Sequence, residues 1–157
     1  MNSMADRLKS ERGAELIEFA LILPLLLLVI VGIFDFGFLF QRYEVLTNAA
    51  REGARMAVLP NYTQTDVQNR VCAFLTSGGV PNTGCSSNPV VTVTDVTVPV
   101  GGGLPAIQAK SVQVAYTHTY SFIGPIISLV GGTWTNVQTI TTTAVMRTEI
   151  QNTAAGS

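Results

Sequence analysis

Residues 12–60 decide how this chain folds, and they read RGAELIEFALILPLLLLVIVGIFDFGFLFQRYEVLTNAAREGARMAVLP. The first half of this stretch is apolar, and no charged residue lies between Phe19 and Phe34. The second half, from Gln41, is charged and rich in alanine, and it ends at Leu59-Pro60, where the residue before proline disfavours helix. We therefore predict one long helix whose first half lies in a membrane and whose second half extends beyond it.

The apolar half is long enough to cross a bilayer. From Phe19 to Phe40 the chain has 22 residues, or about 33 Å of helix, against a hydrocarbon core of about 30 Å. A cleaved secretory signal, whose apolar region usually has about 7–15 residues, is the less favoured alternative. Pro24 lies inside the run and predicts a kink there.

The charge distribution sets limits on partners and orientation. Charged residues make up 12% of the 157 residues, against about 25% in an ordinary soluble domain. The net charge of −1 gives no electrostatic case for nucleic acid as a partner. Arg7, Lys9 and Arg12 precede the apolar run and favour a cytoplasmic N-terminus. Three arginines follow the run, so orientation also depends on the cysteines of the second half.

Those cysteines, Cys72 and Cys85, lie 13 residues apart in a polar region rich in Thr, Ser, Asn and Gly. In an exported domain, such a pair is more often a disulfide than two free thiols. Closing a loop of that size stabilises a domain by about 3 kcal/mol in the chain-entropy model. With His118 as the only histidine, the chain offers too few soft ligands for zinc, and we expect no metal or cofactor.

Two carboxylates bracket the apolar run. Glu18 interrupts an apolar start, and near the end of a span it either needs a cationic partner or reaches the headgroups. Asp35 is expected at the outer interface. Aromatic side chains gather near the same end, which is typical of a lipid boundary, with subunit contacts as the alternative. They are Phe34, Phe36, Phe38, Phe40 and Tyr43.

Gly13 is followed by Ala14-Glu15-Leu16-Ile17-Glu18-Phe19, which resembles the processing site of type IV prepilins and pseudopilins. In those proteins a membrane peptidase cuts after the glycine and leaves a glutamate as the fifth residue of the mature chain. The resemblance implies a cut between Gly13 and Ala14, with Glu18 as that glutamate.

Residues 12–55 as a whole resemble the TadE family of the Tad (tight adherence, Flp-type) pilus system. The resemblance is specific at Arg12-Gly13 to Phe19, at Leu23-Pro24 and at Asn48–Arg55. It implies a pseudopilin or minor pilin that helps to assemble a pilus of the major Flp pilin. The implied partners are a prepilin peptidase, TadF-like subunits, the major Flp pilin, the inner-membrane assembly platform and membrane lipid. The implied location is the bacterial inner membrane, crossed once, with the C-terminal domain in the periplasm; incorporation of the subunit into the pilus is left open.

The resemblance also suggests how such helices pack. Cleavage creates an amine at Ala14, and the amine of one subunit can approach the Glu18 carboxylate of its neighbour, which offsets the burial of both charges. The residues expected to take part in helix packing or assembly are Glu18, Phe19, Pro24, Asp35, Arg51, Glu52, Gly53 and Arg55.

Beyond the membrane, the helix carries a stripe of mostly small side chains at three- and four-residue steps. The stripe comprises Leu46, Ala49, Ala50, Gly53 and Ala57. It predicts packing against the protein's own sheet, or alternatively against a partner helix. On another face, Glu52 and Arg55 are three residues apart and can pair weakly.

The remaining chain predicts a small exported domain. Thr65-Asp66 is expected to cap a helix that runs to about Thr76. Alternating residues predict strands at 91–98, 110–122 and 137–150, and residues 123–130 predict a buried turn or a lip that touches the membrane. We expect an α+β, pilin-like fold in which a long N-terminal transmembrane helix extends into a small antiparallel sheet. The exposed strand edges offer a place for a neighbour's strand.

These patterns divide the chain into a leader (1–13), a transmembrane helix (14–40), an extracytoplasmic helix extension (41–59), an α+β domain (60–150) and a loose tail (151–157). No catalytic set accompanies them: His118 is typical of a surface or hydrogen-bonded strand residue, and no G-x-S-x-G motif occurs. We therefore expect no enzyme. The alternative to a pilin-like subunit is an unprocessed, single-pass anchored protein whose periplasmic domain binds a ligand or protein.

Overall fold

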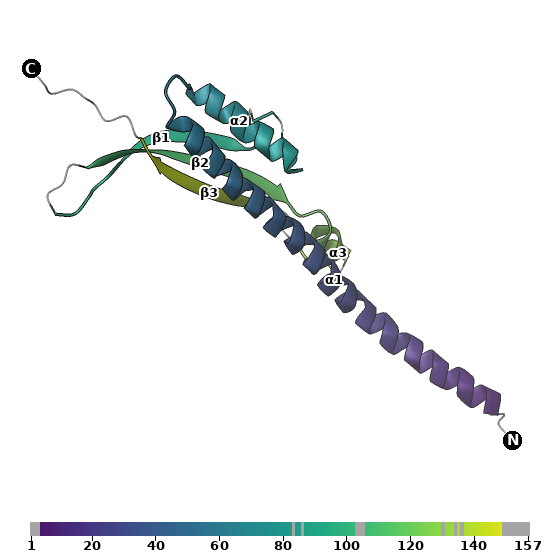
Figure 1. Ribbon diagram of the computed structural model, residues 1–157. Helices are drawn as coiled ribbons and strands as arrows, with labels where there is room; N and C mark the ends of the chain where they lie inside the picture. Colours follow the sequence, from purple (N-terminus) through teal and green to yellow (C-terminus); the bar gives the residue numbers. More distant parts are fainter. Residues whose placement is uncertain are drawn as a thin grey trace, which may run out of the picture. The chain divides into compact units, whose positions relative to one another are not determined.

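The computed structural model describes residues 4–82, 84–85, 87–102, 106–129, 131–133, 135 and 137–148. In chain order its elements are α1 (Met4–Ala57), α2 (Gln64–Ser77), β1 (Val90–Val98), β2 (Ile107–Thr119), α3 (Ile123–Leu129) and β3 (Val137–Arg147) (Figure 1). They confirm the expected α+β class with a long N-terminal helix. The chain divides into two compact units, Met1–Phe38 with Tyr120–Asn136, and Leu39–Thr119 with Val137–Ser157.

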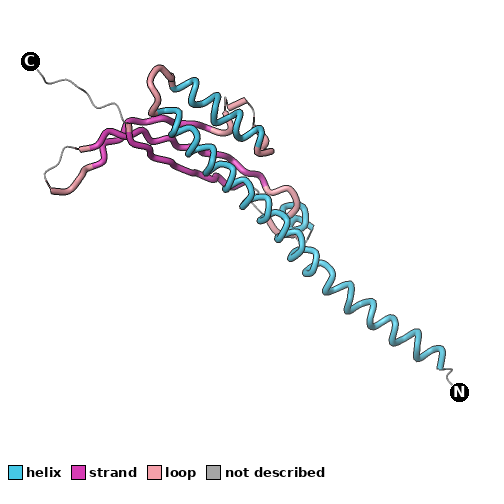
Figure 2. Tube along the Cα trace, in the orientation of Figure 1, coloured by secondary structure: helices cyan, strands magenta, loops and turns pink. Residues whose placement is uncertain are grey.

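Helix α1 is a single helix of 54 residues, drawn in cyan in Figure 2. It begins at Met4, so the predicted leader is helical from that residue onward, and it continues through Pro24. The kink at Pro24 stays a prediction. The helix ends at Ala57, slightly before the predicted stop at Leu59-Pro60, and the Leu59 N–H then donates to the Met56 carbonyl at 3.1 Å.

The first unit contains α3 in addition to the apolar part of α1. The sequence predicted either a turn or a membrane lip at residues 123–130, and the turn is wrong: residues 123–129 form a short helix. Pro125 lies in the first turn of this helix. There its missing N–H removes no helical hydrogen bond, because the first N–H groups of a helix have no partner inside it.

The second unit contains an antiparallel sheet in the order β1-β2-β3, so β2 is the central strand. All three predicted strands are present. The central strand begins at Ile107 rather than 110 and ends at Thr119 rather than 122. The third strand ends at Arg147, and residues 149–150 of the prediction lie outside the described residues. The predicted tail, 151–157, also lies outside them.

Helix α2 begins two residues earlier than predicted, because Thr63 and not Thr65-Asp66 is its N-cap. The Asp66 N–H donates to Thr63 Oγ1 at 3.3 Å, and the Thr63 N–H donates to Asp66 Oδ2 at 2.8 Å. This reciprocal pair is a capping box, which requires a spacing of three residues. The hydroxyl of Thr63, followed by its backbone N–H, holds the pKa of Asp66 below its ordinary value.

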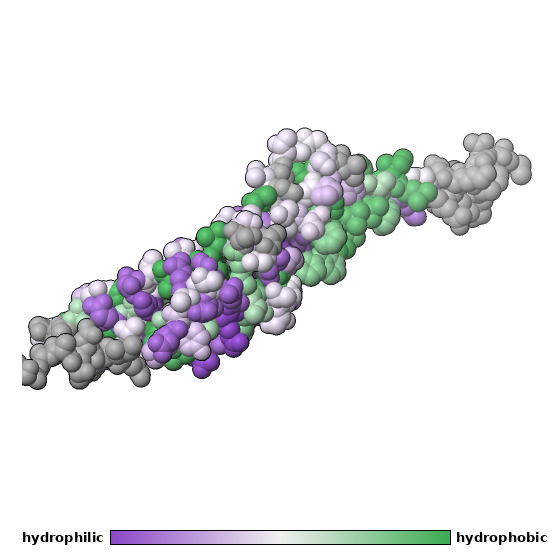
Figure 3. Space-filling view, turned by 90° about the horizontal axis from the view of Figure 1, so that it is seen from above, coloured by the Kyte–Doolittle hydropathy of each residue, from purple (hydrophilic) through white to green (hydrophobic). Residues whose placement is uncertain are grey.

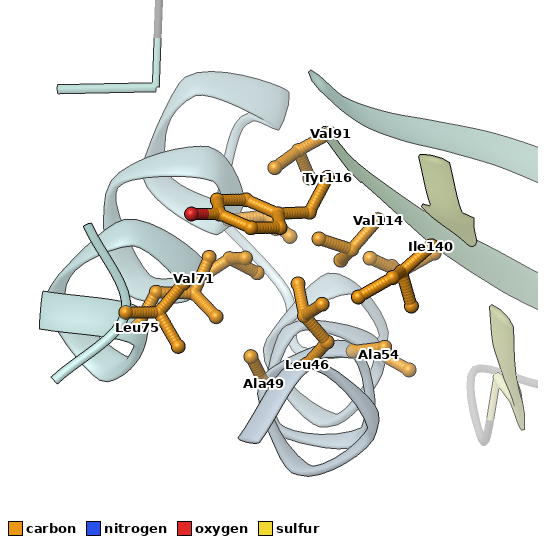
Figure 4. Close-up of a cluster of buried hydrophobic side chains, with 13 residues drawn as sticks. Leu46, Ala49, Ala54, Val71, Leu75, Val91, Val114, Tyr116 and Ile140 are labelled. Carbon is orange, nitrogen blue, oxygen red and sulfur yellow. The ribbon is translucent and has the colours of Figure 1, made fainter. Parts of the chain in front are cut away.

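The hydrophobic core of the second unit lies where α1 and α2 meet the sheet (Figure 4). Side chains from α1, α2 and the strands point toward one another there: Leu46, Ala49, Ala54, Val71, Leu75, Val91, Val114, Tyr116 and Ile140. The small-residue stripe of α1 therefore packs inside its own unit, which is the first of the two predicted alternatives. Ala57, at its end, is only partly buried.

Gly53 is the point of closest approach in this core. A Cβ at this position would lie 2.6 Å from Val71 Cγ2 and 3.2 Å from Val112 Cγ1. A larger side chain would therefore push α1 away from both α2 and the sheet. Gly53 was expected to take part in helix packing, and the helix that it meets is α2 of the same chain.

Candidate functional site

The predicted processing site lies within α1. Gly13 and Ala14 are both helical, and Glu18 follows one turn later with its side chain exposed. A Cβ at Gly13 would meet no atom within 4 Å, so the fold does not require glycine at this position. A glycine in a helix interior costs about 0.5–1 kcal/mol relative to alanine. Its presence therefore has no structural explanation in the described residues.

The apolar part of α1 presents large hydrophobic side chains on its whole surface. Phe19 is more than half exposed and Leu21 is 76% exposed. Pro24 lies among these exposed residues. The helix contains an 18-residue window whose mean hydropathy is 2.9, and none of that window is buried. Figure 3 shows the hydrophobic residues along this part of α1 in green. Among the described residues, it is the one helix long and apolar enough to cross a membrane, and it fits a single-pass anchor.

Asp35 has partners that the sequence did not indicate. Its position at the outer interface stays a prediction, and its side chain is 2% exposed. Its carboxylate accepts the backbone N–H groups of Phe122 at 3.1 Å and Ile123 at 2.7 Å, and that of Ser121 at 3.4 Å. Ile123 is the first residue of α3, and Ser121 and Phe122 directly precede it, so none of these N–H groups has an acceptor within that helix. No local sequence pattern signals this contact, because the partners lie 86 to 88 residues away.

The aromatic side chains around Asp35 remain exposed. Phe34, Phe38, Phe40 and Tyr43 are each about half exposed or more, as a lipid boundary or subunit contact requires. Phe36 is also half exposed, and its ring meets that of Tyr120 edge to face at a centroid distance of 6.2 Å. The aromatic cluster therefore includes a residue from the segment that follows β2.

Three charged side chains form a cluster near the C-terminal end of α1, beyond its apolar part. Arg55 Nε lies 3.2 Å from Glu52, so the predicted pair is present. Arg70 of α2 also donates to Glu52, with Nη2 at 2.8 Å from Oε1. The hydrogen bond from Arg70 is the largest cause that holds the pKa of Glu52 below its ordinary value, and Arg55 adds to it. Arg51 is exposed.

The Glu52–Arg70 pair joins α1 to α2, so we expect Arg70→Gln to lower the free energy of unfolding. Both arginines are largely exposed, and solvent screening limits the loss to about 0.5 kcal/mol at neutral pH. Because the pKa of Glu52 is lowered in the folded state, its contribution is present above the ordinary glutamate pKa of about 4.3 and is lost as the pH falls through the lowered value. The measurement is urea unfolding of the detergent-solubilised protein at neutral and acidic pH.

The matched control is Arg51→Gln, which removes the same charge from the exposed side of α1. We expect it to leave the unfolding free energy nearly unchanged at both pH values. A loss with Arg70→Gln that is equally large at neutral and strongly acidic pH would contradict the role of the ionised Glu52.

Two further contacts fix the second unit. His118 was expected to be a surface or hydrogen-bonded strand residue; it is buried on β2, and Arg42 of α1 hydrogen-bonds to its Nδ1. The disulfide Cys72–Cys85 is present, with Cα atoms 6.0 Å apart, and it ties α2 to the loop before β1. Among the described residues, no group of three or more His, Cys, Asp or Glu side chains is placed to hold a metal ion.

The predicted processing motif, the exposed apolar residues and the buried stripe lie within one continuous segment, helix α1. Residues 13–55 match the family described as TadE-like protein. The match confirms the resemblance over this segment, which includes Gly13, Glu18, Asp35 and the Glu52–Arg55 pair. It relates the TadE-like segment to the Tad pilus machinery in general. No curated protein and no solved structure matches the chain.

Proposed function

We propose that this chain is a pilin-like structural subunit, a pseudopilin or minor pilin, that helps to assemble a Tad pilus and has no enzymatic role. The observation that carries the proposal is the TadE-like match at residues 13–55, which begins at the predicted cut and covers the exposed apolar helix. The same helix then enters the core of the second unit through Leu46, Ala49 and Ala50. One element therefore serves as membrane anchor, assembly surface and part of the folded domain.

The proposed assembly step uses the first turn of the processed helix. Cleavage after Gly13 leaves a positive amine at Ala14, about 6 Å along the axis from Glu18. Glu18 is exposed on α1, so its carboxylate is accessible to a neighbouring helix. In lipid each charge alone is costly, whereas the two together offset much of that cost. When two helices pack side by side in a fixed register, the Ala14 amine of one is paired with the Glu18 carboxylate of the other.

The proposed partners follow from the same segment. A prepilin peptidase removes residues 1–13, and the bared helix packs with other pilin-like subunits, namely TadF-like proteins and the major Flp pilin, at the inner-membrane assembly platform. The N-terminus faces the cytoplasm, in keeping with its basic head, and the disulfide-containing unit faces the periplasm.

The test of this proposal is the intact mass of the protein after co-expression with a prepilin peptidase. We expect the product to lack residues 1–13 and to begin at Ala14, whereas expression without the peptidase gives the full chain. A full-length product in both cases would favour the unprocessed membrane-anchored binding protein instead.

A further inference from the structure

The segment that contains α3 is unusual for a loop between two strands. No charged residue occurs from Thr119 to Met146. Residues 120–136 group with Met1–Phe38 and not with the sheet from which the segment emerges and to which it returns. The segment therefore belongs to the same compact unit as the apolar helix.

Asp35 sets the depth of this segment relative to the membrane. The uncharged run from Phe19 to Phe34 has 16 residues, about 24 Å of helix. When this run is centred in a hydrocarbon core of about 30 Å, roughly 3 Å of the core remains beyond each of its ends. Asp35 is the next residue, and it lies within that margin. Because the Ile123 N–H is 2.7 Å from Asp35 Oδ2, the start of α3 lies at the same depth.

The contact between them is suited to an environment without water. A carboxylate at this depth is costly unless it has partners, and the N–H groups at the start of a helix carry a similar cost when they are buried without partners. Here the carboxylate of Asp35 accepts from three such groups and is almost fully buried. The carboxylate and the N–H groups therefore satisfy one another's hydrogen-bonding capacity without water.

The exposed residues of 121–128 are uncharged, namely Ser121, Phe122, Pro125 and Ser128. The backbone N–H of Phe122 donates to Asp35, and its side chain is 50% exposed. On the facing helix, Phe34, Phe36 and Phe38 are also about half exposed. Aromatic side chains are enriched at the level of the headgroups, where one side meets the acyl chains and the other meets water.

We propose that residues 121–129, held by Asp35, lie in the membrane interface and form a second contact with lipid beside the spanning helix. The occupant of this surface is the outer leaflet of the same bilayer that α1 crosses. This contact requires that α1 crosses the membrane, but it requires neither cleavage after Gly13 nor the pairing of Glu18. It would fix the depth and the rotation of the protein before any partner binds.

The test measures depth by fluorescence in vesicles of phosphatidylethanolamine and phosphatidylglycerol. The full chain first receives Trp134→Phe, which removes its only tryptophan, and then Phe122→Trp as the probe. We expect lipids brominated close to the headgroup to reduce the emission by roughly two-fold, as for an aromatic residue at the interface. Lipids brominated near the chain ends should quench it less.

Two other probe positions in the same background serve as controls. Leu27→Trp lies in the middle of the apolar run and should be quenched most by lipids brominated near the chain ends. Leu59→Trp, beyond the end of α1 and about 33 Å or more from Asp35 along the helix, should not be quenched. Quenching of Leu27→Trp without quenching of Phe122→Trp would overturn the proposal. If neither probe were quenched, α1 would not span the bilayer, and the proposed lipid contact would be overturned as well. The cleavage assay would remain interpretable in that case.

The role of Asp35 is tested in the protein that carries Phe122→Trp. We expect Asp35→Ala to abolish the quenching of Trp at 122, whereas the same change with Leu27→Trp should leave that probe quenched. Asp35→Asn keeps one acceptor oxygen and should retain part of the signal, so it serves as the milder variant if Asp35→Ala does not fold. Full quenching at 122 in both variants would show that Asp35 does not hold the segment.

Discussion

Gly13→Leu is expected to abolish removal of residues 1–13 by a prepilin peptidase. A site shaped for a small residue excludes a larger one, and we expect cleavage to fall by at least about 100-fold. The fold itself should tolerate the change, because a Cβ at Gly13 meets nothing within 4 Å. Leucine is also a better helix former than glycine by up to about 1 kcal/mol. The readout is the intact mass after co-expression with the peptidase.

Helix α1 offers a matched control for this experiment. A Cβ at Gly32 would likewise meet no atom within 4 Å, and Gly32→Leu places the same side chain in the same helix away from the cut. We expect Gly32→Leu to be processed like the native chain. If Gly13→Leu were processed equally well, the assignment of the cleavage site would be wrong, whatever the fate of the helix.

The parts of the structure that the sequence predicts well depend on short-range periodicity. The small-residue stripe from Leu46 to Gly53 repeats every three or four residues, and the β2 alternation of Val112, Val114 and Tyr116 repeats every two; all of these side chains are buried. Each pattern needs only the geometry of its own element. The length of the apolar run likewise predicts a spanning helix without any knowledge of the rest of the chain.

The parts of the structure that the sequence does not predict depend on pairs of residues that lie far apart along the chain. The sequence predicts Asp35 at the membrane interface but gives no sign of its backbone partners, which lie more than 80 residues later. Arg70 completes the Glu52 pair from a different helix, and Arg42 reaches His118 across 76 residues. Periodicity carries no information about such pairs, because each side chain is compatible with solvent in its own local pattern.

Glu18→Ala is expected to leave cleavage and membrane insertion intact and to abolish association between processed subunits. Breaking a buried charge pair by removing one partner costs about 3 kcal/mol or more, which corresponds to a loss of association of more than about 100-fold. Because Glu18 is exposed on α1, its removal disturbs no packing within the chain. The measurement is co-purification of two differently tagged processed copies, and of the tagged chain with the major Flp pilin, from mild detergent.

Glu15→Ala is the matched control, since Glu15 is an exposed acid three residues earlier in the same helix. We expect it to associate normally, and Glu18→Asp should recover part of the association because it restores the charge. A second arm combines Glu18→Ala with Gly13→Leu, which keeps the amine at Ala14 from forming. If the Ala14 amine and the Glu18 carboxylate act as a pair, the double variant should be no weaker than either single one. Additive losses would mean that the two residues act independently, and normal association of Glu18→Ala would remove the charge pair from the assembly mechanism.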